Sequence, residues 1–195
     1  MESSDAAWIG GYIVDYNELA RIAVENGAAK ATVIPVEKIV LSSVFRDICK
    51  SNGCGNYGRC WMCPPHTGTI EENMAAVRSF PKGLLFQTIG QLEDSFDIEG
   101  MQEAKRIHLQ VCQRLLDATK PVFTGRTLYL GAGGCGLCET CAIIQNEPCR
   151  FPDRAMPPME GYGIGVANTA SSTELKYING QNTVTYFGLV LFDEA

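Results

Sequence analysis

The residues of this chain whose type and spacing could do chemistry are its nine cysteines, because eight of them fall into two tight groups. The first cysteine group consists of Cys49, Cys54, Cys60 and Cys63, and the second consists of Cys135, Cys138, Cys141 and Cys149. An odd number of cysteines, in a chain with no export signal, argues against a framework of disulfides. Thiolates that are close in sequence can instead converge on one metal ion or cluster, so the grouping indicates metal binding.

The second group contains the run "CGLCETC", which places Cys135, Cys138 and Cys141 at successive C-x2-C spacing. Three thiolates so close together can ligate three different irons of a cubane, with backbone N–H groups directed at its sulfides, as in bacterial ferredoxins. Zinc usually takes C-x2-C pairs that are well separated along the chain. The run therefore predicts a [4Fe-4S] cluster, with zinc or a metal-free thiol site as the alternatives.

The fourth ligand of this cluster is less directly indicated. Ferredoxins continue with x3-C-P, whereas here Cys149 follows Cys141 after seven residues and Pro148 precedes it. The longer spacer could let Cys149 fold back onto the same cluster. The alternative is Cys63, the cysteine that is followed by a proline.

The first group has irregular spacing, in a loop whose glycines at 53, 55 and 58 permit the positive φ values of a tightly folded backbone. If all four cysteines bind, this loop holds a second cluster. If Cys60 points away, three thiolates leave one iron open to water, to substrate or to another ligand such as His66. A loop that only covers the edge of a core with Trp61 and Tyr57 is the purely structural alternative.

The two groups together resemble a family of bacterial and archaeal proteins described as cysteine-rich, predicted metal-binding proteins of unknown function. The resemblance rests on C-x4-C-G-N-Y-G-x2-W-x-C-P-P and on C-G-L-C-x2-C-x7-C-R-F-P-x-R-A-M-P-P-M-E-G-Y-G-I, and it spans roughly residues 33 to 170. It implies metal binding by the cysteines of the motifs, without Cys60, and it implies no defined reaction. The implied ligands are Cys49, Cys54, Cys63, Cys135, Cys138, Cys141 and Cys149.

The cysteines must be positioned by helices and strands. The chain length and the pattern of these elements predict a single α/β domain over residues 1–195, with metal-binding loops at 49–66 and 135–150. Apolar periodicity and capping signals predict helices near 15–29, 43–50, 69–80 and 97–120, and strands near 30–36, 38–42, 83–89, 127–131 and 182–192. The strand, long helix and strand over 83–131 predict a central β-α-β unit with parallel strands in a mixed sheet. The second cysteine loop would then follow the end of a strand, where α/β sheets usually bind ligands.

Charge and composition exclude other classes. The net charge of −6 and the lack of any basic run argue against a nucleic-acid partner. The first twenty residues contain neither a signal peptide nor a membrane span, so we expect a cytoplasmic protein with no membrane partner.

Several other side chains are candidates for smaller roles. Cys112 and His108 lie on the apolar stripe of the long helix and are expected in the core, although a His-x3-Cys metal pair is conceivable. Glu160 and Tyr162 could supply a proton near the metal, and Glu160 could equally cap a helix. The cations near the cysteines, which could offset the charge of a cluster or simply lie at the surface, are Lys50, Arg59, Arg150 and Arg154.

The leading hypothesis for function is an iron–sulfur protein with one or two [4Fe-4S] clusters, which transfers electrons or reductively activates a partner. That partner would be a redox protein or an enzyme that carries a cofactor. One alternative is a metalloenzyme in which an open iron with three cysteine ligands binds substrate. The other is a zinc-stabilised binding module.

Overall fold

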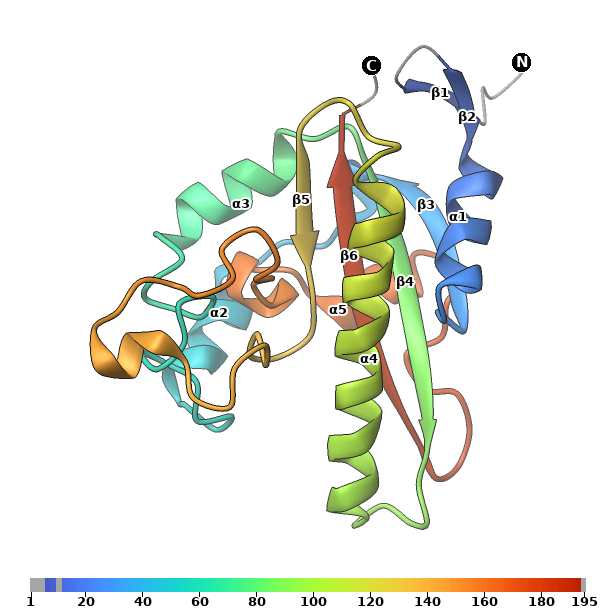
Figure 1. The fold of residues 1–195 in the computed structure, drawn as a ribbon. Helices are drawn as coiled ribbons and strands as arrows, with labels where there is room; N and C mark the ends of the chain where they lie inside the picture. The colour runs from blue at the N-terminus through green and yellow to red at the C-terminus, as the bar shows by residue number, and fades with distance from the viewer. Residues whose placement is uncertain (1–5, 10–11, 194–195) are drawn as a thin grey trace.

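The fold is α/β, as a computed structural model of residues 6–9 and 12–193 shows (Figure 1). No helix within these residues has the length and apolar composition needed to cross a membrane. The elements in chain order are β1 Ala6–Ile9, β2 Tyr12–Asp15, α1 Tyr16–Glu25, β3 Lys30–Pro35, the 3-10 helix η1 Val36–Lys38, α2 Ser43–Lys50, α3 Ile70–Arg78, β4 Lys82–Gln91, α4 Ile98–Thr119, β5 Thr127–Leu130, the 3-10 helices η2 Ala142–Gln145 and η3 Met159–Tyr162, α5 Val166–Ser171 and β6 Thr183–Phe192.

The central sheet has four strands in the order β3-β4-β6-β5, and every neighbouring pair is antiparallel. β4 and β5 do run in the same direction, since each is antiparallel to β6, and α4 connects them along the chain. However, β6 lies between them, so the sheet is antiparallel rather than mixed. A separate two-stranded sheet pairs β1 with β2 and precedes α1.

Two apolar cores lie on opposite faces of the sheet because neighbouring residues of a strand point to opposite sides. Leu84 and Phe86 of β4 pack with α1 and α4 on one face, whereas Leu85 packs on the other face with α3, η3 and α5. α4 and α1 cover the near face of the sheet in Figure 1. Since both faces are covered, residues 83–88 of β4 are all buried, including the polar Gln87 and Thr88, and burial does not alternate along the strand.

Most helices begin and end close to the predicted positions, because their signals are local. α3 opens with the expected capping box, in which Thr69 and Glu72 bond each other's backbone N–H groups. The strand predicted at 38–42 is wrong: this stretch contains the end of η1 and one isolated bridge, from Leu41 to Ile164. β3 is an edge strand, as Pro35 at its end predicts.

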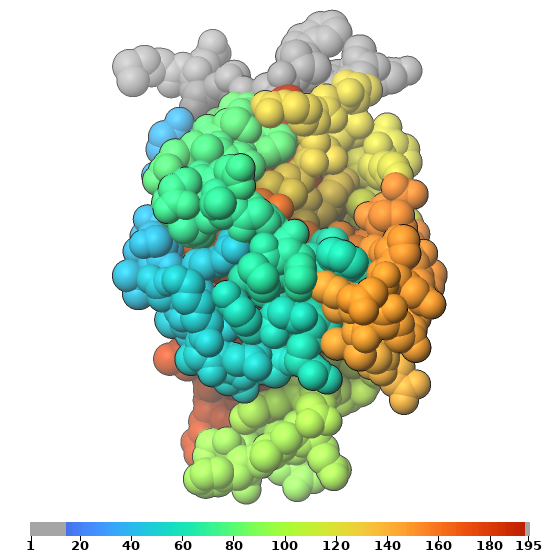
Figure 2. Space-filling view, turned by 90° about the vertical axis from the view of Figure 1, so that its left-hand side faces the viewer, coloured from blue at the N-terminus to red at the C-terminus, as the bar shows by residue number. Residues whose placement is uncertain are grey.

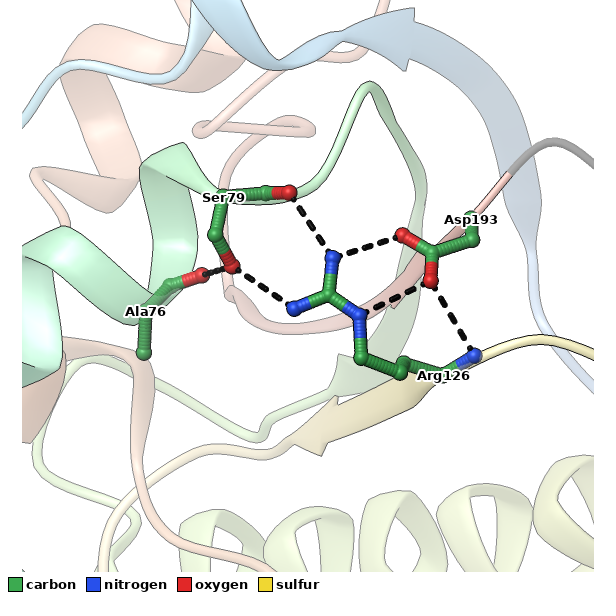
Figure 3. Close-up of polar contacts among 4 residues, drawn as sticks. All are labelled: Ala76, Ser79, Arg126 and Asp193. Atoms are coloured by element: carbon green, nitrogen blue, oxygen red, sulfur yellow. Dashed lines mark hydrogen bonds and ion pairs between the residues drawn. The ribbon is translucent and has the colours of Figure 1, made fainter.

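Arg126 joins three elements at the start of β5 (Figure 3). Its Nε and Nη2 atoms both donate to the Asp193 carboxylate at 2.9 Å, and Nη1 donates to the Ser79 hydroxyl at 3.2 Å. Ser79 Oγ in turn donates to the Ala76 carbonyl at 2.8 Å, so the end of α3 is linked to the end of β6. These contacts hold the end of β5 that lies opposite the second cysteine loop.

His108 and Cys112 are core residues, as expected. His108 is fully buried, with its Nδ1 atom 2.9 Å from the Thr88 hydroxyl and its Nε2 atom 3.4 Å from the Cys112 sulfur. Burial lowers the pKa of His108 from 6.5 to about 4, so the ring is neutral in the folded protein at pH 7.

The stability of the fold should therefore depend on pH through His108. Between pH 6.5 and 4 the unfolded chain binds a proton at His108 and the folded chain does not, so stability is complete above pH 6.5 and falls as the pH approaches 4. The fall amounts to about 3 kcal/mol. Urea unfolding of wild type and His108→Gln at several pH values measures it, and equal pH dependence in the two proteins would contradict the prediction.

Candidate metal centre

The two cysteine groups come together on one face of the molecule although about eighty residues separate them along the chain. Figure 2 shows this face, with the first cysteine loop in cyan to teal lying against the second loop in orange. The Trp61 backbone N–H donates to the Cys141 sulfur at 3.5 Å, and its indole N–H donates to the Glu147 carbonyl at 2.9 Å. Trp61 therefore connects the two loops directly.

All four cysteines of the second group line one narrow cavity of about 30 Å³, which we call the Cys149 cavity. Cys60 of the first group also lines this cavity. The five thiols are Cys60, Cys135, Cys138, Cys141 and Cys149. The sequence did not indicate that Cys60 would join the second group.

The other three cysteines of the first group, Cys49, Cys54 and Cys63, line a larger cavity of about 390 Å³, which we call the Cys49 cavity. Cys63 lies here and not at the Cys149 cavity. The remaining wall is mostly apolar, and one carboxylate, Glu160, belongs to it. The main apolar contributors are Phe45, Ile48, Tyr57, Pro64 and Pro158.

A third, polar cavity of about 300 Å³ lies next to both and is called the Lys105 cavity. Asn56 and Gly134 line this cavity and the Cys49 cavity, and four of the cysteines at the Cys149 cavity also reach it. Two cations, Arg59 and Lys105, line it, and neither forms an ion pair within the described residues. They share the cavity with four cysteines and would offset negative charge that develops there.

The first loop is folded by local hydrogen bonds rather than by regular structure. α2 begins at the Ser42 cap and ends at Lys50, so it delivers Cys49 on its last turn. Asn52 adopts a positive φ of 54°, and its side-chain oxygen accepts from the Tyr57 N–H at 3.0 Å. The Gly58 N–H donates to the Pro64 carbonyl at 2.8 Å, which closes the loop on itself.

The second loop starts directly after β5, as the sequence predicts. Gly133 and Gly136 both have positive φ, which turns the backbone sharply before Cys138. At the far end, Arg150 donates to the Thr140 carbonyl at 3.0 Å and to the Gln145 side chain at 2.8 Å. Arg150 therefore closes the loop, and contact with the Cys138 sulfur contributes to its raised pKa.

The thiols of Cys60 and Cys63 shift each other's pKa in opposite directions. The Cys63 thiol beside Cys60 lowers the pKa of Cys60, and backbone N–H groups of Cys135 and Met62 lower it further, while burial opposes them. The same contact and burial raise the pKa of Cys63. Cys60 is therefore the thiol of this pair that ionises first. Burial also raises the pKa of Cys135 and of Cys49.

Arg46 is a residue of the site that the sequence analysis missed. It is only 7 % exposed, and its guanidinium donates to the Gly161 carbonyl at 3.0 Å and to the Gly68 carbonyl at 2.6 Å. No carboxylate pairs with it among the described residues, yet it is close enough to Cys49 that its charge partly offsets the rise in the pKa of that thiol caused by burial. A buried cation without a carboxylate partner is unfavourable even where carbonyl oxygens accept from it, so this position suits an anionic neighbour. Its signal in the sequence was its place three residues before Cys49 on one helix face.

The other candidate residues lie elsewhere. Lys50 is exposed and pairs with Asp47, and Arg154 forms a two-bonded pair with Asp117 of α4. His66 is exposed, packs edge-on against the Trp61 ring at 5.2 Å, and lines a separate cavity with Tyr129 and Tyr162. Neither His66 nor Tyr162 lines one of the three cavities that contain the cysteines.

The glycines of the two loops allow a graded test of how tightly the loops must fold. Gly136 has a φ of +70°, and a Cβ added there would lie 2.5 Å from Leu109 Cδ1 of α4. Gly55 also has a positive φ, of +74°, but a Cβ added there would meet no other atom. Gly53 has neither a positive φ nor a close neighbour. Gly136→Ala should lower the free energy of unfolding by at least about 2 kcal/mol, Gly55→Ala by about 1 kcal/mol, and Gly53→Ala by less than about 0.5 kcal/mol. Urea unfolding measures all three, and equal effects would contradict this account.

No three His, Cys, Asp or Glu side chains within residues 6–9 and 12–193 stand close enough together to hold a single metal ion. The cysteine sulfurs share cavities, but they are spread around them rather than gathered at one point. This arrangement differs from a preformed tetrahedral zinc site, whose sulfurs all lie about 2.3 Å from one ion.

The fold and the site define an α/β protein in which two cysteine-rich loops form adjoining cavities lined by thiols, side chains that commonly bind metals. The chain belongs to the family described as predicted metal-binding protein (DUF2284), whose model matches residues 32–192. This confirms the family, whose members are predicted to bind metal, and it identifies neither the metal nor the ligands. Neither a curated protein nor a solved structure matches the chain.

Proposed function

We propose that this protein binds two [4Fe-4S] clusters on its two cysteine groups and uses them to pass single electrons to a partner, either a redox protein or an enzyme that carries a cofactor. The observation that carries the proposal is the convergence of eight cysteines, from two distant loops, on adjoining cavities. When bound, such clusters supply one-electron oxidation and reduction.

The donor set supports iron–sulfur chemistry. The Cys149 cavity offers thiols and no histidine or carboxylate, and soft thiolates select zinc, copper(I) or iron–sulfur clusters. In a [4Fe-4S] cluster each thiolate binds a different iron, so four sulfurs surround the cluster instead of meeting at one ion. Cysteines that are spread around a cavity fit this requirement better than they fit zinc.

We assign Cys135, Cys138, Cys141 and Cys149 to one cluster and Cys49, Cys54 and Cys63 to the other. Cys60 stands at the Cys149 cavity as a fifth thiol, outside the residues of the family motif. Its place beside Cys63 would put it between the two proposed clusters, and the Cys63 N–H donates to the Cys60 carbonyl at 3.0 Å.

The surroundings of the thiols would tune and stabilise anionic clusters. A [4Fe-4S] core with four thiolates carries a charge of about −2 when oxidised and about −3 when reduced, so hydrogen bonds and cations must offset it. The Trp61 N–H donates to the Cys141 sulfur, and although burial raises the pKa of Cys135, the backbone N–H groups of Leu137 and Met156 partly offset that rise. The cations around the cavities are Arg46, Arg59, Lys105 and Arg150.

Electron transfer also requires that the clusters be near each other and near the surface. Only Trp61 and Met62 separate Cys60 from Cys63, so the two cavities adjoin across one short turn. Cys54 is exposed, and Ile144 and Phe151 beside the second group are exposed apolar side chains. A partner that docks on this face would approach both clusters.

Reductive titration of the anaerobically purified protein, followed by EPR, tests the proposal. We expect two reducible clusters per chain whose spectra broaden each other when both are reduced, since their cavities adjoin. A protein that accepts no electron at potentials down to the low end of the [4Fe-4S] range, about −700 mV, would contradict an electron-transfer function.

A second candidate function is an enzyme in which an iron at the first group binds substrate. It is favoured by one observation, namely that only three cysteines line the roomy Cys49 cavity. An EPR spectrum of the reduced protein that changes with added small molecules would favour this candidate over a simple carrier.

A further inference from the structure

The Cys49 cavity lacks a fourth thiol. Cys60, the remaining cysteine of the first loop, lines the Cys149 and Lys105 cavities but not this one. A [4Fe-4S] cluster on Cys49, Cys54 and Cys63 would therefore have one iron without a cysteine ligand. That iron needs a ligand other than cysteine from the wall of the cavity.

Glu160 is the one carboxylate on this wall. Apart from the N–H of its own backbone, its side chain has no hydrogen-bond or ion-pair partner within the described part of the chain. It lies near Cys49, because its charge contributes to raising the pKa of that thiol after the larger effect of burial. A partly buried carboxylate that faces a cavity and lacks a partner is an oxygen donor free to bind a metal.

The backbone holds Glu160 firmly in this position. Gly131, the residue after β5, forms a bridge to Pro158, and the Met159 N–H donates to the Gly131 carbonyl at 3.0 Å. Just beyond Glu160, the Gly161 carbonyl accepts hydrogen bonds from Arg46 at 3.0 Å and from Asn73 at 3.3 Å. The segment is thus tied to β5, α2 and α3, so the carboxylate is presented to the cavity by a rigid support.

We propose that the Glu160 carboxylate is the fourth ligand of the cluster on Cys49, Cys54 and Cys63, an assignment that rests on the two-cluster function proposed above. The oxygen donor makes this corner of the cluster the one at which iron is most readily lost or bound by another molecule, because thiolates hold iron–sulfur clusters more firmly than carboxylates do.

Oxidation with ferricyanide tests the ligand directly. Ferricyanide takes one electron from the oxidised [4Fe-4S] core, which then releases one Fe²⁺ from its weakest corner and leaves a [3Fe-4S] core with a distinct EPR signal. The wild type should form about one [3Fe-4S] cluster per chain, from the first group alone.

Substitutions of Glu160 should change this reaction in opposite directions. Glu160→Cys supplies a thiolate and should slow the loss of iron at least about 10-fold, whereas Glu160→Gln replaces the anionic oxygen with a weaker donor and should speed it several-fold. Glu139→Gln is the matched control, because it removes an exposed carboxylate beside the second group, at the Lys105 cavity, and should react like wild type.

The outcomes separate this assignment from the function on which it rests. Protein that purifies with neither iron nor sulfide overturns the two-cluster function itself. If the protein contains both clusters, two results overturn only the role of Glu160: the wild type forms no [3Fe-4S] signal, or Glu160→Gln loses iron at the wild-type rate. If Glu160→Cys does not assemble its clusters, the rates of iron loss of Glu160→Gln and Glu139→Gln still test whether Glu160 is a ligand.

Discussion

Replacement of Cys149 by serine is expected to halve the iron content, from about eight to about four per chain, while replacement of Cys60 leaves it unchanged. Both thiols line the Cys149 cavity together with Cys135, Cys138 and Cys141, so five sulfurs compete for four positions. The resemblance to the family implies Cys149 and not Cys60 as a ligand, so we assign the fourth position to Cys149. Serine offers a harder oxygen in place of a soft thiolate and should not hold the iron.

Iron and acid-labile sulfide are measured on each variant after anaerobic purification. Cys112→Ser is the matched control, since Cys112 is a buried cysteine of α4 that lines none of the cysteine cavities, and it should keep all of its iron. If Cys60→Ser loses half of the iron and Cys149→Ser keeps it, Cys60 is the fourth ligand and our assignment is wrong.

Replacement of Arg46 by methionine should remove the cluster from the first group and leave the second intact. The substitution keeps most of the side chain's length but deletes the only buried cation among the described residues, which lies near Cys49, and it leaves the Gly161 carbonyl without one of its donors. An anionic cluster then loses the charge that offsets it. We expect about half of the iron to be lost, and the free energy of unfolding of the metal-loaded protein to fall by about 3 kcal/mol.

Lys50→Met is the control for Arg46→Met. Lys50 belongs to the same helix but is exposed and paired with Asp47, so its loss should change neither iron content nor stability appreciably. If Arg46→Met retains its iron and the reduction potential of the first cluster does not move, Arg46 has only a structural role and the charge argument fails.

The parts of this fold that the sequence predicts are those set by short-range signals. α2 and α3 follow the predicted ranges closely, because caps at Ser42 and Thr69 act within one helical turn. The insertion of β6 between β4 and β5 could not be predicted in this way. Strand pairing depends on contacts between residues up to about a hundred positions apart, and β6 reads as a simple closing strand in the sequence.

The site shows the same division. The cysteine spacing predicts two groups of candidate metal ligands, but it does not predict that Cys60 stands with the second group or that Lys105 reaches across from α4. Lys105 carries no local signal, because its approach to the glycine loop depends on how α4 packs on the sheet. Arg154, which looks in sequence like a cation of the second group, is instead held by Asp117 of α4.

Two adjoining clusters, one fully bound by thiolates and the other with a carboxylate corner, would give this small protein two distinct redox sites on one face. The cluster on the second cysteine group would act as a stable electron carrier, since none of its coordination positions is free. The cluster on the first cysteine group would lie in a cavity with apolar walls, where its carboxylate-bound iron is open to any molecule that enters. Both the carrier function and the substrate-binding alternative therefore depend on the same condition, namely that iron and sulfide bind in these cavities.

The most direct test of whether iron and sulfide bind in these cavities is to measure the amount of iron, acid-labile sulfide and zinc per chain in protein purified without oxygen. Our account predicts about eight iron and about eight sulfide, with no stoichiometric zinc. Colourless protein that contains stoichiometric zinc and no sulfide would contradict it.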